Sequence, residues 1–483
     1  MNPKDRFSSR WAIIAVGLGM AVGTGNLWRF PRVATQNGGG AFLIAWMLFM
    51  VLWSLPLLNA EFGLGRDTRR GPIGAFSATL GKRFSWMGGF VVATSLMIMS
   101  YYSVITGWTL KYFLVSLSIE SESNWTSYWQ TYSASVWQPI GFQVLVILLA
   151  LAVVTRGVIA GIERVNKVLI PALFCLLIIA VGGALNLDGS EKGLAFLFLP
   201  RFEDLLSYQI WLEALTQSAW STGAGWGLML TYACYVKVDE DVVGPSVAIG
   251  LGNNLASILA GTAIVAIVFS LLTVPEAMEV MASGNTGMTF IWLPELFQRM
   301  PGGQVFLPIF FLALFFAALS SLIAMIELGV KTLIDRGYSR SHGALLIGLF
   351  GTLCGIPSAV NLAVFENQDW VWGLALMICG LFVSLASSRG SQVRVTDEEP
   401  TVQRKERRGW VEVLLIYLIP LQFSLMFGWW IYQAVFVFAP NSWWNLFSVN
   451  GLGTCLLQWG LVLAILRYFN RELAEENKTR KEL

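Results

Sequence analysis

Charged residues are scarce in this sequence. Only 13% of its 483 residues are Asp, Glu, Lys or Arg, whereas a soluble globular domain carries about 25%. The net charge of +2 provides no strongly basic surface, so nucleic acid is not an expected partner. Hydrophobic residues make up 55% of the chain, and the mean hydropathy is +0.63. This composition indicates an integral membrane protein whose main partner is the lipid bilayer.

Residues with catalytic or cross-linking chemistry are also few. His342 is the single histidine, which nearly excludes histidine-based catalysis. The five cysteines form no C-x-x-C pair, so they predict neither a disulfide framework nor a metal site. A G-x-x-x-x-G-K-[ST] phosphate loop is absent, which argues against ATP hydrolysis. The best acids within apolar segments, Glu61 and Glu327, are far apart in the sequence, so we do not expect an enzyme.

Twelve long apolar segments fill most of the chain. Each is close to the ~20 residues that a helix needs to cross a bilayer. The sequence therefore predicts an all-α polytopic membrane protein with twelve transmembrane helices. The segments lie near residues 10–36, 40–65, 85–114, 140–156, 164–185, 209–236, 244–272, 304–336, 343–360, 370–388, 411–438 and 451–469.

Lys and Arg are distributed unevenly between the connecting loops. The N-terminal segment 1–9, the loop 389–410 and the tail 470–483 are basic, whereas loops 115–139 and 439–450 contain no Lys or Arg. Cytoplasmic loops of membrane proteins carry the excess of these residues. We therefore expect both termini in the cytoplasm. The polar, basic N-terminus also predicts that no cleavable signal peptide is present.

Two of the apolar segments contain glycine-dense interruptions, at Gly17–Gly25 and at Ser221–Gly227. If residues 10–185 and 209–388 are two repeats of five helices, these interruptions occupy equivalent positions. Paired interruptions of this kind point to a transporter binding site near the membrane midplane. Membrane glycines also serve close helix packing. Packing alone does not explain the Asn26 and Arg29 side chains beside the first interruption.

Unwound backbone inside a membrane is tolerated only where it lines a cavity or is buried in protein. The freed carbonyl oxygens suit a small cation, and amides at a half-helix N-terminus suit a carboxylate. Arg29 costs roughly 2.5–3.5 kcal/mol at a helix centre, so we expect a partner for it. Asp369 is the best candidate; the alternative is that Arg29 extends to the membrane surface.

The sequence around these interruptions resembles the neurotransmitter:sodium symporters, specifically their bacterial, leucine-transporter-like members. The resemblance spans the first ten segments. It implies that residues 10–388 form a transport core, which is a 5+5 inverted repeat in which helices 1 and 6 are unwound. It also implies a secondary active symporter in the plasma membrane, the inner membrane of a bacterium. Helices 11–12, at 411–469, match poorly, and the choice between monomer and dimer stays open. The matching motifs are NLWRFP (26–31), NGGGAF (37–42), SYYSVITGW (100–108), GIERVNK (161–167), TYACYV (231–236) and FFAALSSLIAM (315–325).

The resemblance implies two sodium sites built from neutral oxygens. The first site would combine the Ala21 carbonyl with the side chains of Asn26, Ser221 and Asn253, and the substrate carboxylate would complete it. The second site would use the carbonyls of Gly19, Val22 and Ala317 and the hydroxyls of Ser320 and Ser321.

The resemblance also implies an amino-acid substrate. Monoamine transporters of the family carry an Asp where this chain has Gly23, so the substrate here should bring its own carboxylate. We expect a small neutral amino acid such as glycine or alanine; the alternatives are an N-methylated or betaine-like solute held by Trp rings, or a larger hydrophobic amino acid. The expected substrate residues are Ala21, Thr24, Gly25, Ile98, Tyr102, Trp220, Ser221, Gly223, Trp226, Ser321, Leu322 and Met325.

Chloride and two gates complete the expectations from the resemblance. Chloride dependence is expected because Ser257 stands where chloride-independent relatives have Glu; the chloride residues would be Trp46, Gln217, Ser221, Asn253 and Ser257. Trp46 replaces the usual Tyr, which places this site in question.

The outer gate would pair Arg29 with Asp369, under which Tyr102 and Trp220 form a lid. The inner gate would pair Asp335 with Lys4 and Arg6, assisted by Tyr235. A channel would instead need a continuous polar pore, and a receptor would not need two ion sites.

Overall fold

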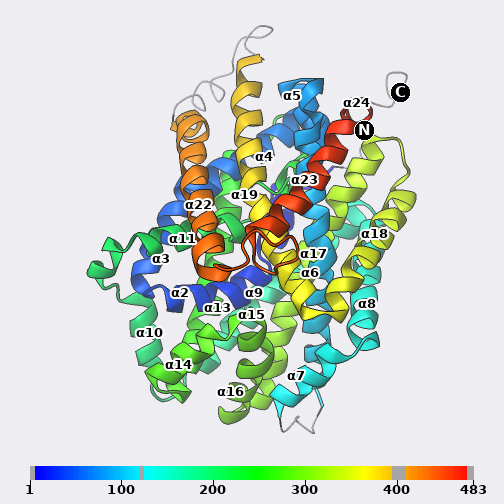
Figure 1. Cartoon of the computed structure of the whole chain (residues 1–483). Coiled ribbons are helices and arrows are strands. Elements are labelled where there is room, and N and C mark those ends of the chain that lie inside the picture. Colours follow the sequence, from blue (N-terminus) through cyan, green and yellow to red (C-terminus); the bar gives the residue numbers. More distant parts are fainter. Residues whose placement is uncertain (1–5, 119–123, 394–409, 476–483) are drawn as a thin grey trace.

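The computed structural model describes residues 6–118, 124–393 and 410–475. Helices are the only regular elements within these ranges, which confirms the all-α prediction. Figure 1 shows them gathered into one bundle, with α5 (Pro72–Leu80) and α24 (Asn470–Ala474) at one end and the short helices α7 (Trp125–Ala134), α14 (Val274–Ala282) and α16 (Leu293–Arg299) at the other.

All twelve predicted segments are helical where they are described. Within the described ranges, nine helices are long and apolar enough to cross a bilayer, and a pair bent by 57° supplies a tenth span. The segment near 209–236 is divided into α11 and α12, and the last segment forms the 17-residue helix α23. The loop predicted at 115–139 contains α7, and α19 starts at Leu362, so Asp369 lies inside that helix rather than at its start.

The helices of the first repeat and its loops have the following bounds: α1 Arg10–Ala21, η2 Gly25–Arg29, α2 Phe30–Gln36, α3 Gly40–Phe49, η3 Met50–Ser54, α4 Leu55–Thr68, η4 Lys82–Phe84, α6 Ser85–Ser116, α8 Trp137–Val154, η5 Val158–Glu163, α9 Arg164–Leu185, α10 Ser190–Phe198 and η6 Phe202–Leu206. The remaining elements are α11 Tyr208–Ser221, α12 Leu228–Ala233, α13 Val243–Leu271, α15 Gly284–Gly287, η7 Met288–Trp292, α17 Gly303–Asp335, α18 Arg340–Val360, α19 Leu362–Val393, α21 Trp410–Val413, η9 Leu414–Leu418, α22 Ile419–Gln433, η10 Ala434–Phe438 and α23 Leu452–Tyr468.

Both glycine-dense interruptions are breaks in the helices. The first break lies between α1 and η2, where Val22 adopts an extended conformation (φ −80°, ψ 102°). The second separates α11 from α12, and Gly223, Gly225 and Gly227 there have φ of 65°, 92° and 78°. Side chains other than glycine rarely adopt such angles, which explains the glycines of this segment.

Glu61 of α4 satisfies the backbone at the second break. Its Oε1 accepts a hydrogen bond from the Gly227 amide at 2.7 Å, and its Oε2 accepts one from the Leu230 amide at 3.2 Å. The side chain is fully buried. A carboxylate is stabilised by the partial positive charge at a helix N-terminus, so Glu61 holds the start of α12 in place.

Candidate substrate and ion site

The two breaks face a common cavity. Its volume is about 70 Å³. Eleven of the twelve predicted substrate residues line it; the twelfth, Leu322, is buried and does not belong to the lining. The lining residues are Met20, Ala21, Gly23, Thr24, Gly25, Asn26, Trp28, Arg29, Ile98, Tyr101, Tyr102, Ile105, Trp220, Ser221, Gly223, Trp226, Leu228, Asn285, Ser321, Met325 and Asp369.

Polar groups for a carboxylate gather at the first break. The Thr24 amide donates to the Tyr102 hydroxyl at 3.0 Å. Because that hydroxyl oxygen accepts this bond, its own proton can be donated to another acceptor. A Cβ atom added at Gly25 would meet no atom within 4 Å, so its backbone borders open space.

A cluster of oxygen atoms connects the two breaks next to these groups. Asn253 Oδ1 lies 3.1 Å from the Ala21 carbonyl oxygen and 2.9 Å from the Ser221 carbonyl oxygen. Oxygen atoms this close repel one another. The repulsion is relieved if the Asn253 amide is flipped, so that its nitrogen faces the two carbonyls, or if a cation lies between the oxygens. The Asn26 nitrogen, rather than its oxygen, faces the cluster and donates to Asn253 Oδ1 and to Ser257 Oγ, both at 2.8 Å. The Asn26 Nδ2 group therefore lies among these oxygens, in a position that would also suit a cation.

A second cluster joins α17 to the first break. Ser321 Oγ lies 3.4, 3.3 and 3.3 Å from the carbonyl oxygens of Gly19, Met20 and Val22. Ser320 Oγ donates to the Ala317 carbonyl at 3.0 Å. The cluster therefore brings together Gly19, Val22 and Ser321 of the predicted second sodium site, whereas Ser320 and Ala317 bond to each other within α17. Hard cations such as Na⁺ bind oxygen donors of this kind.

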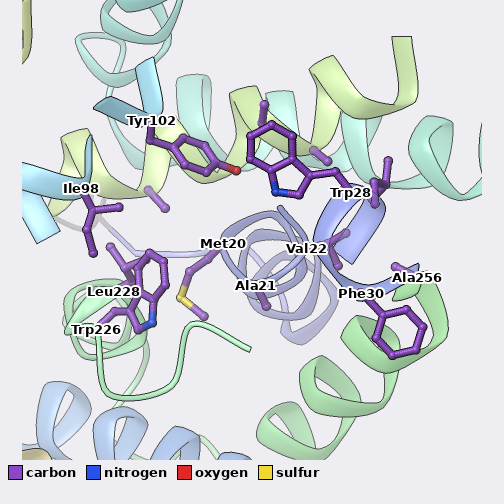
Figure 2. Packing of buried hydrophobic residues seen from close by; sticks show 14 of the residues in the cluster. Met20, Ala21, Val22, Trp28, Phe30, Ile98, Tyr102, Trp226, Leu228 and Ala256 are labelled. Atoms are coloured by element: carbon purple, nitrogen blue, oxygen red, sulfur yellow. The ribbon is translucent and has the colours of Figure 1, made fainter. Parts of the chain in front are cut away.

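Apolar side chains close the other end of the cavity. Figure 2 shows Met20 reaching from the first break toward Trp226, Ile98 and Leu228. A Cβ atom added at Gly223 would lie 3.7 Å from Met20 Cε, so this side chain also fills space beside the second break. The cavity thus has a polar end at Tyr102 and an apolar end at Trp226.

The predicted outer gate residues lie at the mouth of the cavity. The Arg29 guanidinium carbon is 4.8 Å from the centre of the Trp220 ring, a cation–π contact. Arg29 and Asp369 are both described and both line the cavity, but no ion pair joins them here. Closure by this pair therefore stays a prediction for another conformation.

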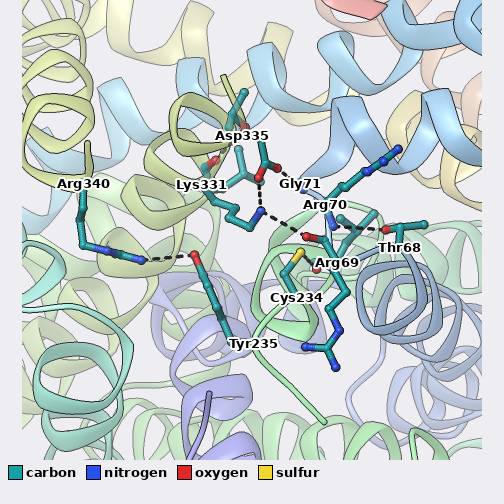
Figure 3. A network of polar contacts seen from close by, with 12 residues as sticks. Thr68, Arg69, Arg70, Gly71, Cys234, Tyr235, Lys331, Asp335 and Arg340 are labelled. Atoms are coloured by element: carbon teal, nitrogen blue, oxygen red, sulfur yellow. Dashed lines mark hydrogen bonds and ion pairs between the residues drawn. The ribbon is translucent and has the colours of Figure 1, made fainter. Parts of the chain in front are cut away.

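At the opposite end of the bundle, polar contacts tie the segment that follows α12 to α17 and α18 (Figure 3). The Tyr235 hydroxyl donates to Glu327 at 2.6 Å, and Arg340 donates to Glu327 at 2.7 Å. Asp335 contacts Lys331 of its own helix and accepts from the Gly71 amide at 2.7 Å. Tyr235 was expected beside Asp335; its hydroxyl is bonded to Glu327 instead.

The N-terminal segment covers this end. Its first described residue, Arg6, is exposed, and Phe7 is buried with its ring edge-on to Tyr235. Lys4 lies outside the described residues. The pairing of Asp335 with Lys4 and Arg6 therefore stays a prediction.

The predicted chloride residues are close to the first oxygen cluster. Asn26, Ser221, Asn253 and Ser257 share hydrogen bonds, and Gln217 Nε2 reaches the Gly25 carbonyl at 3.5 Å. Trp46 is buried and packs on Phe30, with ring centres 4.5 Å apart.

Comparison with known proteins identifies the family to which this chain belongs. The sequence profile described as "Sodium:neurotransmitter symporter family" matches residues 4–139 and 137–366. The chain belongs to this family. It is a sodium-dependent symporter and a multi-pass membrane protein, and its relatives are transporters rather than enzymes.

Individual family members support this assignment. The uncharacterized sodium-dependent transporter YhdH of Bacillus subtilis (strain 168) is 32% identical over 87% of this chain and 96% of its own length. The sodium-dependent neutral amino acid transporter B(0)AT2 of Pongo abelii is 28% identical over 62% of this chain and 45% of its own length. The crystal structure of MhsT in complex with L-phenylalanine is similar with a TM-score of 0.75 and 29% identity, over 88% of this chain and 99% of that one.

Some residues that line the cavity were missed from the sequence. Met20 could have been found, because it lies in the last turn of α1 between the predicted ligands Gly19 and Ala21. Asn285 belongs to the short helix α15 after α14, and no local motif marked it. It accepts a hydrogen bond from Arg32 at 2.8 Å, which connects this loop to α2.

Gly23→Ala should weaken amino-acid binding. A Cβ atom there would lie 2.8 Å from the Tyr102 hydroxyl and 3.0 Å from Ser321 Oγ, so both groups would have to move. We expect binding to weaken by about tenfold or more, since overpacking costs roughly 1–3 kcal/mol. Equilibrium binding of radiolabelled alanine to purified protein measures this. Gly141→Ala is the control, because its Cβ would meet nothing within 4 Å; equal losses in the two variants would contradict the site.

Proposed function

We propose that this symporter imports a small neutral amino acid together with Na⁺, using the cavity between the two breaks. The observation that carries the proposal is that Ala21 and Ser221 of the first oxygen cluster line the same cavity as the Thr24 amide and the Tyr102 hydroxyl, which suit a carboxylate. A carboxylate bound there would complete the coordination of a cation at Asn253. Substrate and ion would then each raise the affinity of the site for the other.

The proposal includes two sodium ions. The first would lie between Ala21, Ser221 and Asn253, and the second beside Ser321. Both clusters consist of neutral oxygens, so each bound Na⁺ ion would carry its full positive charge across the membrane. The membrane potential then adds roughly 2.3 kcal/mol per charge for each 100 mV to inward transport.

The apolar end of the cavity supports a small side chain. Trp226 and Met20 both occupy volume there, and no acidic side chain stands at Gly23 to bind an amine without a carboxylate. A specific observation favours a second candidate, larger hydrophobic amino acids. Met20 is unbranched and adaptable, and the related MhsT has been crystallised with L-phenylalanine. Betaine-like solutes would instead require a Trp cage, and Trp220 already stacks on Arg29.

Alternating access would use the contacts at the two ends of the bundle. The Tyr235–Glu327–Arg340 contacts and the buried Phe7 hold the end with the N-terminal segment closed, while Arg29 and Asp369 are not yet paired. We place the closed end in the cytoplasm, as the distribution of Lys and Arg predicts. Closure of the other end would bring Arg29 and Asp369 together.

Purified protein in proteoliposomes tests the proposed transport. An inward sodium gradient should drive accumulation of radiolabelled alanine, and replacement of Na⁺ by choline should abolish it. Unlabelled glycine and alanine should compete more strongly than leucine, phenylalanine or betaine. Strong competition by leucine or phenylalanine with none by glycine would refute the small substrate and support the second candidate.

Chloride dependence is a separate prediction. Two Na⁺ ions and a zwitterion leave excess positive charge in a medium of low dielectric constant, and the hydroxyl of Ser257 can donate to an anion. Replacing chloride by gluconate should therefore reduce uptake, and Ser257→Glu should restore it by supplying a fixed negative charge. Uptake that is unchanged in gluconate would rule out the chloride site; Ser257→Ala controls for loss of the hydroxyl.

A further inference from the structure

Only one of the two polar atoms of the Asn166 side-chain amide, in α9, forms a hydrogen bond within the described residues. The side chain is fully buried, and its Nδ2 donates to the Ile162 carbonyl at 2.9 Å. Its Oδ1 has no hydrogen-bond partner among the described residues. The Nδ2 bond fixes the orientation of the amide, so the oxygen must face away from its own helix.

This oxygen is directed at the first break. A Cβ atom added at Gly19 would overlap Asn166 Oδ1 and would lie 3.3 Å from Ser320 Cβ. Gly19 therefore stands between the Asn166 oxygen and the Ser320 side chain, and the absence of its side chain lets the oxygen approach. Gly19 also supplies one of the carbonyls around Ser321.

A buried carbonyl oxygen without a donor is unfavourable, because it has lost water and gained no replacement. Buried polar atoms of this kind call for a ligand, an ion or an ordered water. The surroundings of Asn166 Oδ1 favour a cation, since it lies beside Gly19 and Ser320, and the Gly19 carbonyl in turn lies 3.4 Å from Ser321 Oγ.

We propose that Asn166 supplies a further oxygen ligand to the second sodium ion, on the side of the site that faces α9. The ion contacts this oxygen as it enters and leaves the cluster at Ser321. The inference rests on the proposed function, because it requires a sodium ion beside Ser321. It adds a third helix, α9, to a site built from α1 and α17.

The test is a sodium titration of purified protein, which follows the thermal unfolding midpoint and the dissociation of ²²Na⁺. Asn166→Ala should raise the sodium concentration for half-maximal stabilisation by about tenfold, as expected for loss of a supporting ligand group. Asn166→Asp keeps the shape of the side chain and adds negative charge, so it should lower that concentration and slow ²²Na⁺ release.

Gln143→Met is the matched control. Gln143 of α8 is equally buried, its Oε1 likewise has no partner among the described residues, and it packs on Gly355 as Asn166 packs on Gly19. This variant should leave the sodium titration unchanged. The inference is overturned if Asn166→Asp has no effect on the titration, or if Gln143→Met shifts it as much as Asn166→Ala.

A third variant separates failure of this inference from failure of the proposed function. Ser321→Ala should also raise the sodium requirement. If Ser321→Ala has no effect, the second sodium site itself is wrong. If Ser321→Ala weakens sodium binding and both Asn166 variants behave like the unmodified protein, only the role of Asn166 is wrong.

Discussion

Unwound backbone buried in a membrane protein must find partners, and this constraint determines the rest of the structure. Each break in this bundle exposes amides and carbonyls that lipid cannot satisfy. Glu61 takes up amides at the start of α12, and the Tyr102 hydroxyl takes up the Thr24 amide. The carbonyls at Gly19, Ala21 and Val22 converge with side-chain oxygens instead, and these groups are what a small cation requires.

The same constraint links ion and substrate. The first oxygen cluster lies beside the groups that suit a carboxylate, so a zwitterion and a cation would be neighbours in the cavity. Neither cluster contains a fixed negative charge, because Asn, Ser and backbone carbonyls are neutral. The affinity for the cation should therefore depend on what else occupies the site, which is the physical basis of coupled transport.

The sequence predicted the helices and both breaks because apolar runs and glycine density are local signals; most of the lining of the cavity was predicted only through the resemblance to a known family. It could not predict contacts that depend on packing between distant helices. Tyr235 was expected to assist Asp335, yet its hydroxyl donates to Glu327. Leu322 was expected in the cavity, but it is buried in α17 and does not line it. The orientation of Asn166 toward Gly19 depends on how α9 packs against α1, for which no motif exists.

Reciprocal binding tests the central claim most directly. The dissociation constant of alanine is measured on purified protein at several sodium concentrations, and that of ²²Na⁺ at several alanine concentrations. The account predicts that each ligand lowers the dissociation constant of the other by the same factor, because both complete one site. Dissociation constants that do not depend on the other ligand would contradict it.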